Sequence, residues 1–236
     1  MTTGAIRRVW VTRAEAGASR TAARLTDLGF EPVVTPLLEV RLIPQDAPDL
    51  SAVAAVAFTS RNGVAAFVAL TDARACPVFA VGDATARAAR EAGFAEVRSA
   101  AGDLDALARL IRTVWTDPEA VLLHPAAREP AGDLAAAVGG AATVHSLPVY
   151  DVVETRAAPP AEFDAVLVHS PRAARALAVS LPVGAAAGRL AVAISEAAAA
   201  PLAALPFAVL RIADRPDEAA LFAVLTAALG KPRSRV

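Results

Sequence analysis

The chain has little that would support redox, metal or membrane chemistry. Cys76 is its only cysteine, so an intramolecular disulfide is impossible. The histidines, His124, His145 and His169, are scattered, and no His or Cys residues stand at the spacing of metal ligands. No apolar run reaches the roughly 18 to 20 residues of a membrane-spanning helix. We therefore expect neither a metal site nor a membrane segment.

Targeting signals and a bias of charge are also missing. The first residues lead directly into the strand-like run Val9 to Thr12, without the long apolar core and small-residue cleavage site of a signal peptide. The formal net charge of -1 provides no field that would attract nucleic acid. These absences predict a soluble, cytoplasmic protein that binds neither nucleic acid nor membranes.

Glycine-rich loops that bind phosphate are absent as well. The chain contains neither G-x-G-x-x-G nor G-x-x-x-x-G-K-[ST], which weighs against a nucleotide-dependent transferase. Ser60 and Ser170 lie outside any G-x-S-x-G turn, so a serine hydrolase is not indicated.

The chain does contain a repeat. Ala55 to Phe67 and Ala165 to Leu177 are each a short apolar run that ends at a serine and continues into small, helix-favouring residues. Such a repeat indicates two similar domains. It places Ser60 and Ser170 at the carboxyl ends of strands, where open α/β sheets bind ligands.

Apolar, strand-like runs alternate with Ala-rich stretches along the whole chain. This pattern predicts an α/β fold in which parallel sheets are flanked by helices. Gly29 and Gly93 are predicted to end two comparable helices, at Ala14 to Leu28 and Ala84 to Ala92. The predicted strands are Val9 to Thr12, Pro32 to Thr35, Val53 to Thr59, Val78 to Val81, Val121 to His124, Thr143 to Leu147, Ala165 to His169, Leu190 to Ile194 and Ala208 to Ala213.

Two proline-containing segments, Thr35 to Val40 and Leu147 to Val152, are predicted to join the domains. The N-terminal βα unit is too short to fold alone, so we expect it to pack with the C-terminal half. The two domains would then be connected by a two-segment linker, with a cleft between them. A single division near residue 148 is the competing arrangement. The expected domains are residues 1–37 plus 150–236 for the first and residues 40–147, inserted, for the second.

A second repeated pair, Phe79 to Arg87 and Val192 to Ala200, adds another strand end and helix start to each domain. Exposed N–H groups and the dipole at helix N-termini attract carboxylates and phosphates. Several such ends facing one cleft would suit a ligand with many anionic arms. Taken singly, each serine is better explained as an N-cap worth about 1 kcal/mol, and each arginine as a solvated surface residue. The arginines that follow predicted strand ends are Arg13, Arg61, Arg128 and Arg172.

Tyr150 is the only tyrosine, and it lies in the later joint. Its phenol could act as a general acid toward a ligand, or it could form a structural hydrogen bond that fixes the linker. His124 and His169 also end strands, and either could reach a ligand or merely satisfy a carbonyl group.

Several different short motifs follow one another along the chain. They are Val9-Trp-Val-Thr-Arg13, Gly29-Phe30, Thr35-Pro-Leu37, Phe58-Thr-Ser-Arg-Asn-Gly-Val64, Ala80-Val-Gly-Asp-Ala-Thr-Ala86, Leu147-Pro-Val-Tyr150, Asp164-Ala-Val-Leu-Val-His-Ser-Pro171 and Ala193-Ile-Ser195. None is specific alone, but their order and spacing together resemble the uroporphyrinogen-III synthase family over nearly the whole chain.

The resemblance implies a lyase of tetrapyrrole biosynthesis that uses no cofactor. We expect a monomer, because one chain with two domains already completes the cleft. The substrate would be hydroxymethylbilane, a linear tetrapyrrole rich in carboxylate arms, which hydroxymethylbilane synthase could hand over. The family reaction expels the terminal hydroxyl as water. Ring D is attacked at its substituted carbon, and the resulting spiro intermediate recloses with that ring inverted. Closure without the enzyme gives the uninverted type I isomer, so catalysis must restrain conformation, a positioning effect.

The resemblance also assigns roles to residues. Tyr150 matches the family tyrosine proposed to protonate the leaving hydroxyl or to order a water near it. Many members carry a Gly followed closely by Thr where this chain has Ser195 to Ala198, so a hydroxyl expected near Ala197 or Ala198 is absent. The candidate substrate-binding residues are Arg13, Thr59, Ser60, Arg61, Asn62, Gly82, Thr85, Arg128, Ser170, Pro171, Arg172, Ser195 and Ala197.

The main alternative is a protein of another class, a non-catalytic two-domain binder of small anions that closes on its ligand. The repeat and the helix starts suit such a binder equally well. The order of the family motifs favours the enzyme.

Overall fold

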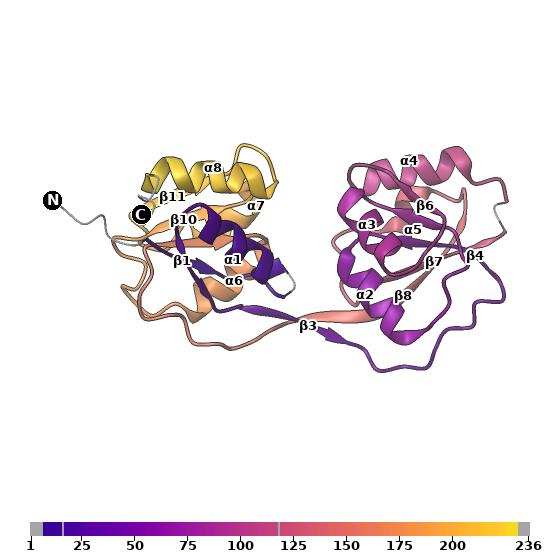
Figure 1. Cartoon of the computed structure of the whole chain (residues 1–236), viewed down its shortest axis with the longest axis horizontal. Helices are drawn as coiled ribbons and strands as arrows, with labels where there is room; N and C mark the ends of the chain where they lie inside the picture. Colours follow the sequence, from indigo (N-terminus) through magenta and orange to yellow (C-terminus); the bar gives the residue numbers. More distant parts are fainter. Residues whose placement is uncertain (1–6, 16, 118, 231–236) are drawn as a thin grey trace. The chain divides into compact units, whose positions relative to one another are not determined.

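The structure is a computed structural model that describes residues 7–15, 17–117 and 119–230. The chain divides into two compact units, which the polypeptide connects twice. Unit 1 comprises Met1–Glu39 and Val153–Val236, and unit 2 comprises Val40–Val152. The early segment (indigo) and the late segments (orange to yellow) of the chain interleave within unit 1 in Figure 1.

The second connection between the units differs from the expected joint before residue 150. Strand β8 (Thr143–Glu154) runs without a break through the expected boundary. Tyr150 still pairs with strand β7 (Val121–Ala127) of unit 2, so it belongs to that unit. The proline at position 148 does not end the strand.

Unit 1 contains a five-stranded parallel sheet with the order β11-β10-β9-β1-β2. The pairing of β1 with β9 joins the start of the chain to its second half, with Trp10 opposite Val166. The strands are β1 (Arg8–Val11), β2 (Glu31–Val34), β9 (Ala165–Val168), β10 (Leu190–Ala193) and β11 (Val209–Ile212).

Unit 2 contains a six-stranded sheet with the order β3-β8-β7-β4-β5-β6. The pairs from β8 through β6 are all parallel. Besides β7 and β8, its strands are β3 (Leu38–Leu42), β4 (Val53–Phe58), β5 (Val78–Ala80) and β6 (Val97–Ser99).

Helices cover both faces of each sheet, because successive residues of a strand point to opposite faces and here both sets are apolar. On β4, Ala55 and Ala57 pack with helices α4 and α5, while Val56 and Phe58 pack with α2 and α3. The helices are α1 (Gly17–Asp27), α2 (Arg61–Leu70), α3 (Asp83–Glu91), α4 (Leu104–Val114), α5 (Leu134–Val138), α6 (Pro171–Ser180), α7 (Glu196–Ala199), the 3-10 turn η1 (Ala200–Leu202) and α8 (Glu218–Leu229).

The predicted α/β class with parallel sheets flanked by helices is confirmed, and every predicted strand overlaps an observed one. Gly29 and Gly93 have φ values of 86° and 98°, as expected for glycines that stop helices. Strand β3 and the three-residue β6 were not predicted. Helix α1 begins at Gly17 rather than at Ala14, and Ala16 lies outside the described residues.

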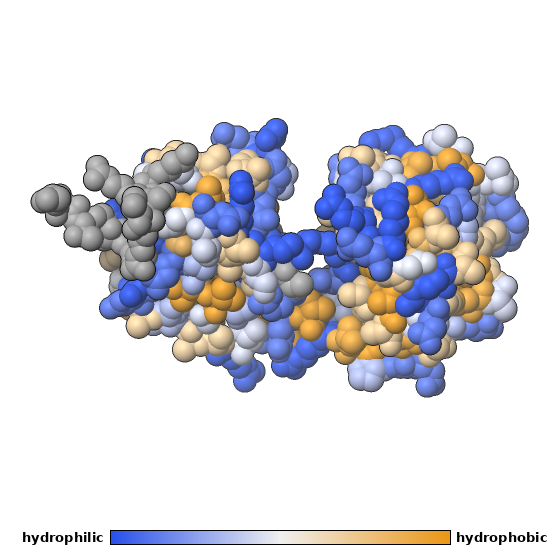
Figure 2. Space-filling model, in the orientation of Figure 1, coloured by the Kyte–Doolittle hydropathy of each residue, from blue (hydrophilic) through white to orange (hydrophobic). Residues whose placement is uncertain are grey.

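Figure 2 shows hydrophilic and hydrophobic residues mixed over the visible face of each unit. Val179 and Val183 are among the large apolar residues left exposed. Within the residues that the structure describes, no helix is both long and apolar enough to cross a membrane.

Candidate functional site

The serine of the first repeat copy begins helix α2, directly after strand β4. Its backbone is extended, with φ -157° and ψ 156°, and Ser60 Oγ accepts a hydrogen bond of 3.0 Å from the Gly63 N–H. Ser170 does the same at α6 in unit 1, where Oγ accepts from the Ala173 N–H at 3.1 Å. The interpretation of both serines as N-caps is therefore confirmed.

Tyr150 reaches the same helix start through an irregularity in strand β8. Ala126 pairs with Pro148 but Ala127 pairs with Tyr150, so one extra residue is inserted in β8. Such a bulge changes the direction in which the next side chain points. The Tyr150 ring packs with Ala66 and Val149, and the residue is 7% exposed.

The phenol ends at the N-cap of α2. Tyr150 Oη lies 2.9 Å from Ser60 Oγ, within hydrogen-bond distance. The adjoining backbone is also fixed, because the Arg128 N–H donates to the Tyr150 carbonyl at 2.8 Å and Arg128 Nε lies 3.3 Å from Asp151 Oδ2. Arg128 therefore lies beside Tyr150, directly after the end of β7, and its guanidinium group is mostly exposed.

A second polar pair involves Thr59, the residue directly before the capping serine, and His124 of strand β7. Thr59 Oγ1 is 3.1 Å from His124 Nε2. His124 is 1% exposed, and its burial lowers the pKa of the imidazole to about 4 although Asp133 opposes the shift. The ring is therefore neutral at pH 7. Nδ1 of His124 has no hydrogen-bond partner within the described residues.

Gly63 allows helix α2 to approach strand β7 closely. A Cβ atom at this position would lie 2.7 Å from the carbonyl oxygen of Pro125, closer than such atoms can stand. Pro125 occurs in β7 beyond Leu123, where pairing with β4 has stopped and only the β8 ladder continues. A proline is tolerated there because one side of the strand no longer needs a ladder N–H.

The next strand of unit 2 supplies a further helix start. Gly82 precedes α3 without a side-chain cap, and the Thr85 N–H donates to the Gly82 carbonyl at 3.0 Å. Thr85 is buried, at 6% exposure. The loop through Gly102 covers the turn, since the Gly102 N–H donates to Val81. The predicted residues Arg61 and Asn62 occupy the first turn of α2 and are half-buried.

The corresponding region of unit 1 is dominated by an ion-pair cluster. Arg13 Nη1 lies 3.1 Å from Glu218 Oε1, and the Thr21 hydroxyl donates to the same oxygen. His169 Nε2 is 3.7 Å from Glu218 Oε1, too far for a hydrogen bond. The predicted substrate-binding residue Arg13 is thus engaged within its own unit, linking β1 and α1 to α8.

Burial and charge shift the acid-base properties of this cluster. The neighbouring His169 imidazole, the Thr21 hydroxyl and the Arg13 guanidinium together lower the pKa of Glu218 to about 2, against the effect of burial. The pKa of His169 is also lowered, but here burial is the main cause, and the positive charge of Arg13 adds to it. A carboxylate beside a neutral histidine is the state expected at pH 7.

The remaining predicted residues of unit 1 lie on helix starts. Pro171 is the first residue of α6 and Arg172 the second. Ser195 caps the short helix α7, where Oγ accepts from the Ala198 N–H at 3.3 Å, and Ala197 is exposed.

The structure therefore brings Thr59, Ser60, Arg128 and Tyr150 together in unit 2, with His124 in contact with Thr59. It groups Arg13 with His169 in unit 1. Sequence reasoning missed Glu218 and Thr21. The acidic pair at 217–218 ahead of an apolar run was an available signal, because acidic residues favour helix starts.

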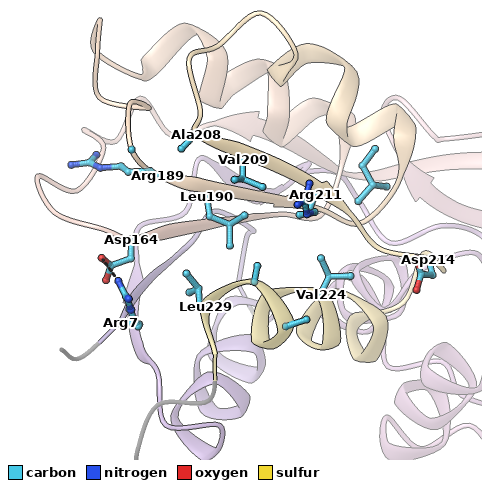
Figure 3. Close-up of a pocket in the computed structure, with 14 residues that line it drawn as sticks. Arg7, Asp164, Arg189, Leu190, Ala208, Val209, Arg211, Asp214, Val224 and Leu229 are labelled. Carbon is cyan, nitrogen blue, oxygen red and sulfur yellow. Dashed lines mark ion pairs between the residues drawn. The ribbon is translucent and has the colours of Figure 1, made fainter. Parts of the chain in front are cut away.

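Two other features bear on ligand chemistry. Within the described ranges, no group of three or more His, Cys, Asp or Glu side chains could hold a metal ion. Unit 1 has a pocket of about 580 Å³ between α8 and strands β10 and β11. Figure 3 shows Leu190 and Val209 from the sheet facing Val224 and Leu229 of α8, with the Arg7–Asp164 ion pair at one end. None of the predicted site residues lines this pocket.

The chain shares its fold with solved structures of uroporphyrinogen-III synthases. The chain is similar to uroporphyrinogen-III synthetase from Helicobacter pylori, with a TM-score of 0.69 and 17% identity over 95% of this chain and 100% of that one. It is also similar to a mutant uroporphyrinogen III synthase from Thermus thermophilus, with a TM-score of 0.53 and 18% identity over 95% and 99% of the two chains.

At these identities the solved structures establish the fold alone. A search of curated protein sequences found no match. The sequence signature of the family described as Uroporphyrinogen-III synthase HemD matches residues 19–223, which is most of the chain. The chain belongs to the uroporphyrinogen-III synthase HemD family.

Proposed function

We propose that the groups at the carboxyl ends of the strands in both units bind hydroxymethylbilane, and that Tyr150 assists departure of its hydroxyl. As a member of its family, the chain cyclises hydroxymethylbilane to uroporphyrinogen III, with loss of water and inversion of ring D. This is a lyase reaction of tetrapyrrole biosynthesis, and the family carries it out without a cofactor.

Substrate binding is assigned to the helix starts because of the charge of the substrate. The first turns of α2, α3 and α6 each follow the carboxyl end of a strand and leave backbone N–H groups directed at the sheet edge. Each such contact with a carboxylate is worth roughly 0.3 to 1 kcal/mol and more when partly buried. Arg61, Asn62 and Arg172 lie in these first turns and can add contacts.

The acid role is assigned to Tyr150 on one observation. Its hydroxyl is held at the N-cap of α2 by Ser60, 2.9 Å away, while its ring is packed in the unit 2 core. A proton donor fixed at an anion-binding helix start can meet a leaving hydroxyl in a substrate whose carboxylates occupy the neighbouring turns. The predicted arginine Arg13 has a weaker case, since Glu218 already neutralises it.

The alternative of a non-catalytic anion binder is not favoured by the family match. We also propose that the chain works as a monomer in the cytoplasm and receives its substrate from hydroxymethylbilane synthase. Two similar units on one chain support the monomer, because both sets of helix starts are present without a second copy. Sedimentation velocity at micromolar concentration tests the oligomeric state, and a stable dimer would contradict the proposal.

Isomer analysis of the product tests the function. The purified chain is incubated with freshly prepared hydroxymethylbilane, the products are oxidised, and the uroporphyrin isomers are separated. We expect type III as the main product, formed faster than in a matched sample with heat-denatured protein. Formation of type I alone, at the rate of the denatured control, would contradict the assignment.

A further inference from the structure

The hydrogen bond between Ser60 and Tyr150 has a direction that matters for the chemistry. Ser60 Oγ has two hydrogen-bond partners among the described residues, the Gly63 N–H at 3.0 Å and Tyr150 Oη at 2.9 Å. The Gly63 N–H can only donate, so it occupies a lone pair of Ser60 Oγ. The single proton of Ser60 is then left with Tyr150 Oη as its acceptor.

We propose that Ser60 donates its proton to Tyr150 and is thereby the positioning residue that keeps the phenol proton available to the substrate. The inference rests on the proposed function and deepens it. In the opposite orientation, Tyr150 would donate its proton in a hydrogen bond to Ser60, and that proton would not be available to the substrate. The Ser60 proton would at the same time lose its acceptor in the described part of the chain.

The proposed orientation also stabilises the state reached after proton transfer. The phenol proton moves to the leaving hydroxyl oxygen, the carbon–oxygen bond breaks with its electron pair, and water departs. The phenolate left on Tyr150 then accepts the Ser60 proton in a charge-assisted hydrogen bond, which is stronger than the neutral one. The Gly63 N–H polarises the Ser60 hydroxyl, and the N-terminal dipole of α2 favours the negative charge. The final ring closure releases one proton from ring D, and that proton restores the phenol.

The second repeat copy shows that capping a helix does not by itself require the contact between serine and tyrosine. Ser170 caps α6 with the same geometry, with Oγ accepting from the Ala173 N–H at 3.1 Å. Its hydroxyl has no tyrosine partner, since Tyr150 is the only tyrosine of the chain. Ser170→Ala therefore removes an N-cap without touching a phenol, and it serves as the matched control for Ser60→Ala.

The single tyrosine makes the test direct. Protein labelled with carbon-13 at the tyrosine Cζ gives one NMR signal, which moves upfield when the phenol oxygen accepts a hydrogen bond and downfield when the phenol donates one. We expect Ser60→Ala to move the Tyr150 signal downfield, since an accepted hydrogen bond is lost. Ser60→Thr, which keeps the hydroxyl, is expected to retain the wild-type signal, and so is Ser170→Ala. An upfield movement or no movement in Ser60→Ala would overturn the proposal.

Kinetics supply the second readout. We expect Ser60→Ala to lower kcat between about ten- and a hundredfold, the usual cost of losing a hydrogen bond to a charged group, with little change in KM. Ser60→Thr should restore most of kcat. A loss of kcat in Ser60→Ala that Ser60→Thr does not rescue would also count against the proposal. If the wild-type chain forms no type III isomer, the proposed function fails, but the NMR signal still decides which hydroxyl donates.

Discussion

The two units share a parallel arrangement of five strands but differ in the chemistry at its carboxyl edge. The order β8-β7-β4-β5-β6 in unit 2 corresponds to β2-β1-β9-β10-β11 in unit 1. In unit 2 the chain reaches β4 before β7, whereas in unit 1 it reaches β1 before β9. The same parallel sheet thus forms from two orders of strands, because unit 2 is inserted between the two segments of unit 1.

The units differ in the residues directly after the equivalent strands β4 and β9. In unit 2, Thr59 and Ser60 pair with His124 and Tyr150, which leaves neutral hydroxyl groups at the helix start. In unit 1, His169 precedes the capping serine and lies near Glu218, which Arg13 neutralises. We infer that unit 2 supplies the proton-transfer chemistry in addition to binding substrate. Unit 1 only binds substrate, and the charged side chains at its strand end are paired with one another.

The close approach of helix α2 to strand β7 at Gly63 distinguishes unit 2 from unit 1. Gly63→Ala would place a Cβ atom 2.7 Å from the Pro125 carbonyl oxygen, whereas unit 1 has Ala173 at the equivalent position of α6. We expect Gly63→Ala to lower the free energy of unfolding by about 2 to 3 kcal/mol, since the backbone of β7 must shift. Urea denaturation measures this. Gly82→Ala is the control, since its Cβ would meet Gly102 at an ordinary 3.5 Å, and an equal loss in both variants would contradict the account.

The buried histidine of unit 2 makes that unit sensitive to acid. The folded-state pKa of His124 is about 4, below the ordinary value of 6.5, so the unfolded chain binds the proton first as the pH falls. We expect stability to decrease by on the order of 2 kcal/mol between about pH 6.5 and 4. His124→Gln should weaken this dependence in urea denaturation curves recorded at pH 7 and 4.5. Identical pH dependence in variant and wild type would show that His124 is not the responsible group.

The ion-pair cluster gives unit 1 a different response to pH. The folded-state pKa of Glu218 is about 2, below its ordinary 4.5, so its stabilising effect is present above about pH 4.5 and is lost as the pH falls toward 2. Because the Glu218 side chain is 36% exposed, solvent screening reduces this contribution to about 1 kcal/mol. We expect Glu218→Gln to be less stable than wild type at pH 7 but not at pH 2. Glu96→Gln, which removes an exposed pair with Arg98, should change little at either pH.

The smallest expected difference between the units is in the loss of stability when each capping serine is replaced. Ser170→Ala is expected to lower the free energy of unfolding by about 1 kcal/mol, the usual value of an N-cap. Ser60→Ala should cost somewhat more, because the hydrogen bond to Tyr150 is lost with the cap. Thermal unfolding of the two variants side by side measures the difference. A larger loss in Ser170→Ala would remove the distinction between the helix starts.

Most of the fold could be predicted from the sequence because its signals are local. Strand β9 (Ala165–Val168) is entirely buried and apolar, and Gly29 stops its helix by a conformation that few other residues adopt. Strand β6 was missed because its three residues include an arginine and a serine and are not buried, whereas the equally short β5 is entirely apolar and buried. The continuation of β8 past Pro148 was missed since only pairing with β7 shows that the strand persists.

Several residues of the candidate site could be singled out from the sequence, but their pairings could not. The repeat identified Ser60 and Ser170, and their capping bonds join residues three positions apart. The contact of Ser60 with Tyr150 depends on the inserted residue in β8, and that of Arg13 with Glu218 joins the two ends of the chain. Such contacts depend on tertiary packing and leave no spacing in the sequence.

The single-turnover rate of Tyr150→Phe tests most directly whether unit 2 supplies the proton. This change removes only the hydroxyl, and the ring can keep its packing against Ala66 and Val149. We predict that uroporphyrinogen III forms about a hundredfold more slowly than with wild type, within the usual range for loss of a general acid, while thermal unfolding stays close to that of wild type. An unchanged rate would contradict the account and leave Tyr150 as a structural residue of strand β8.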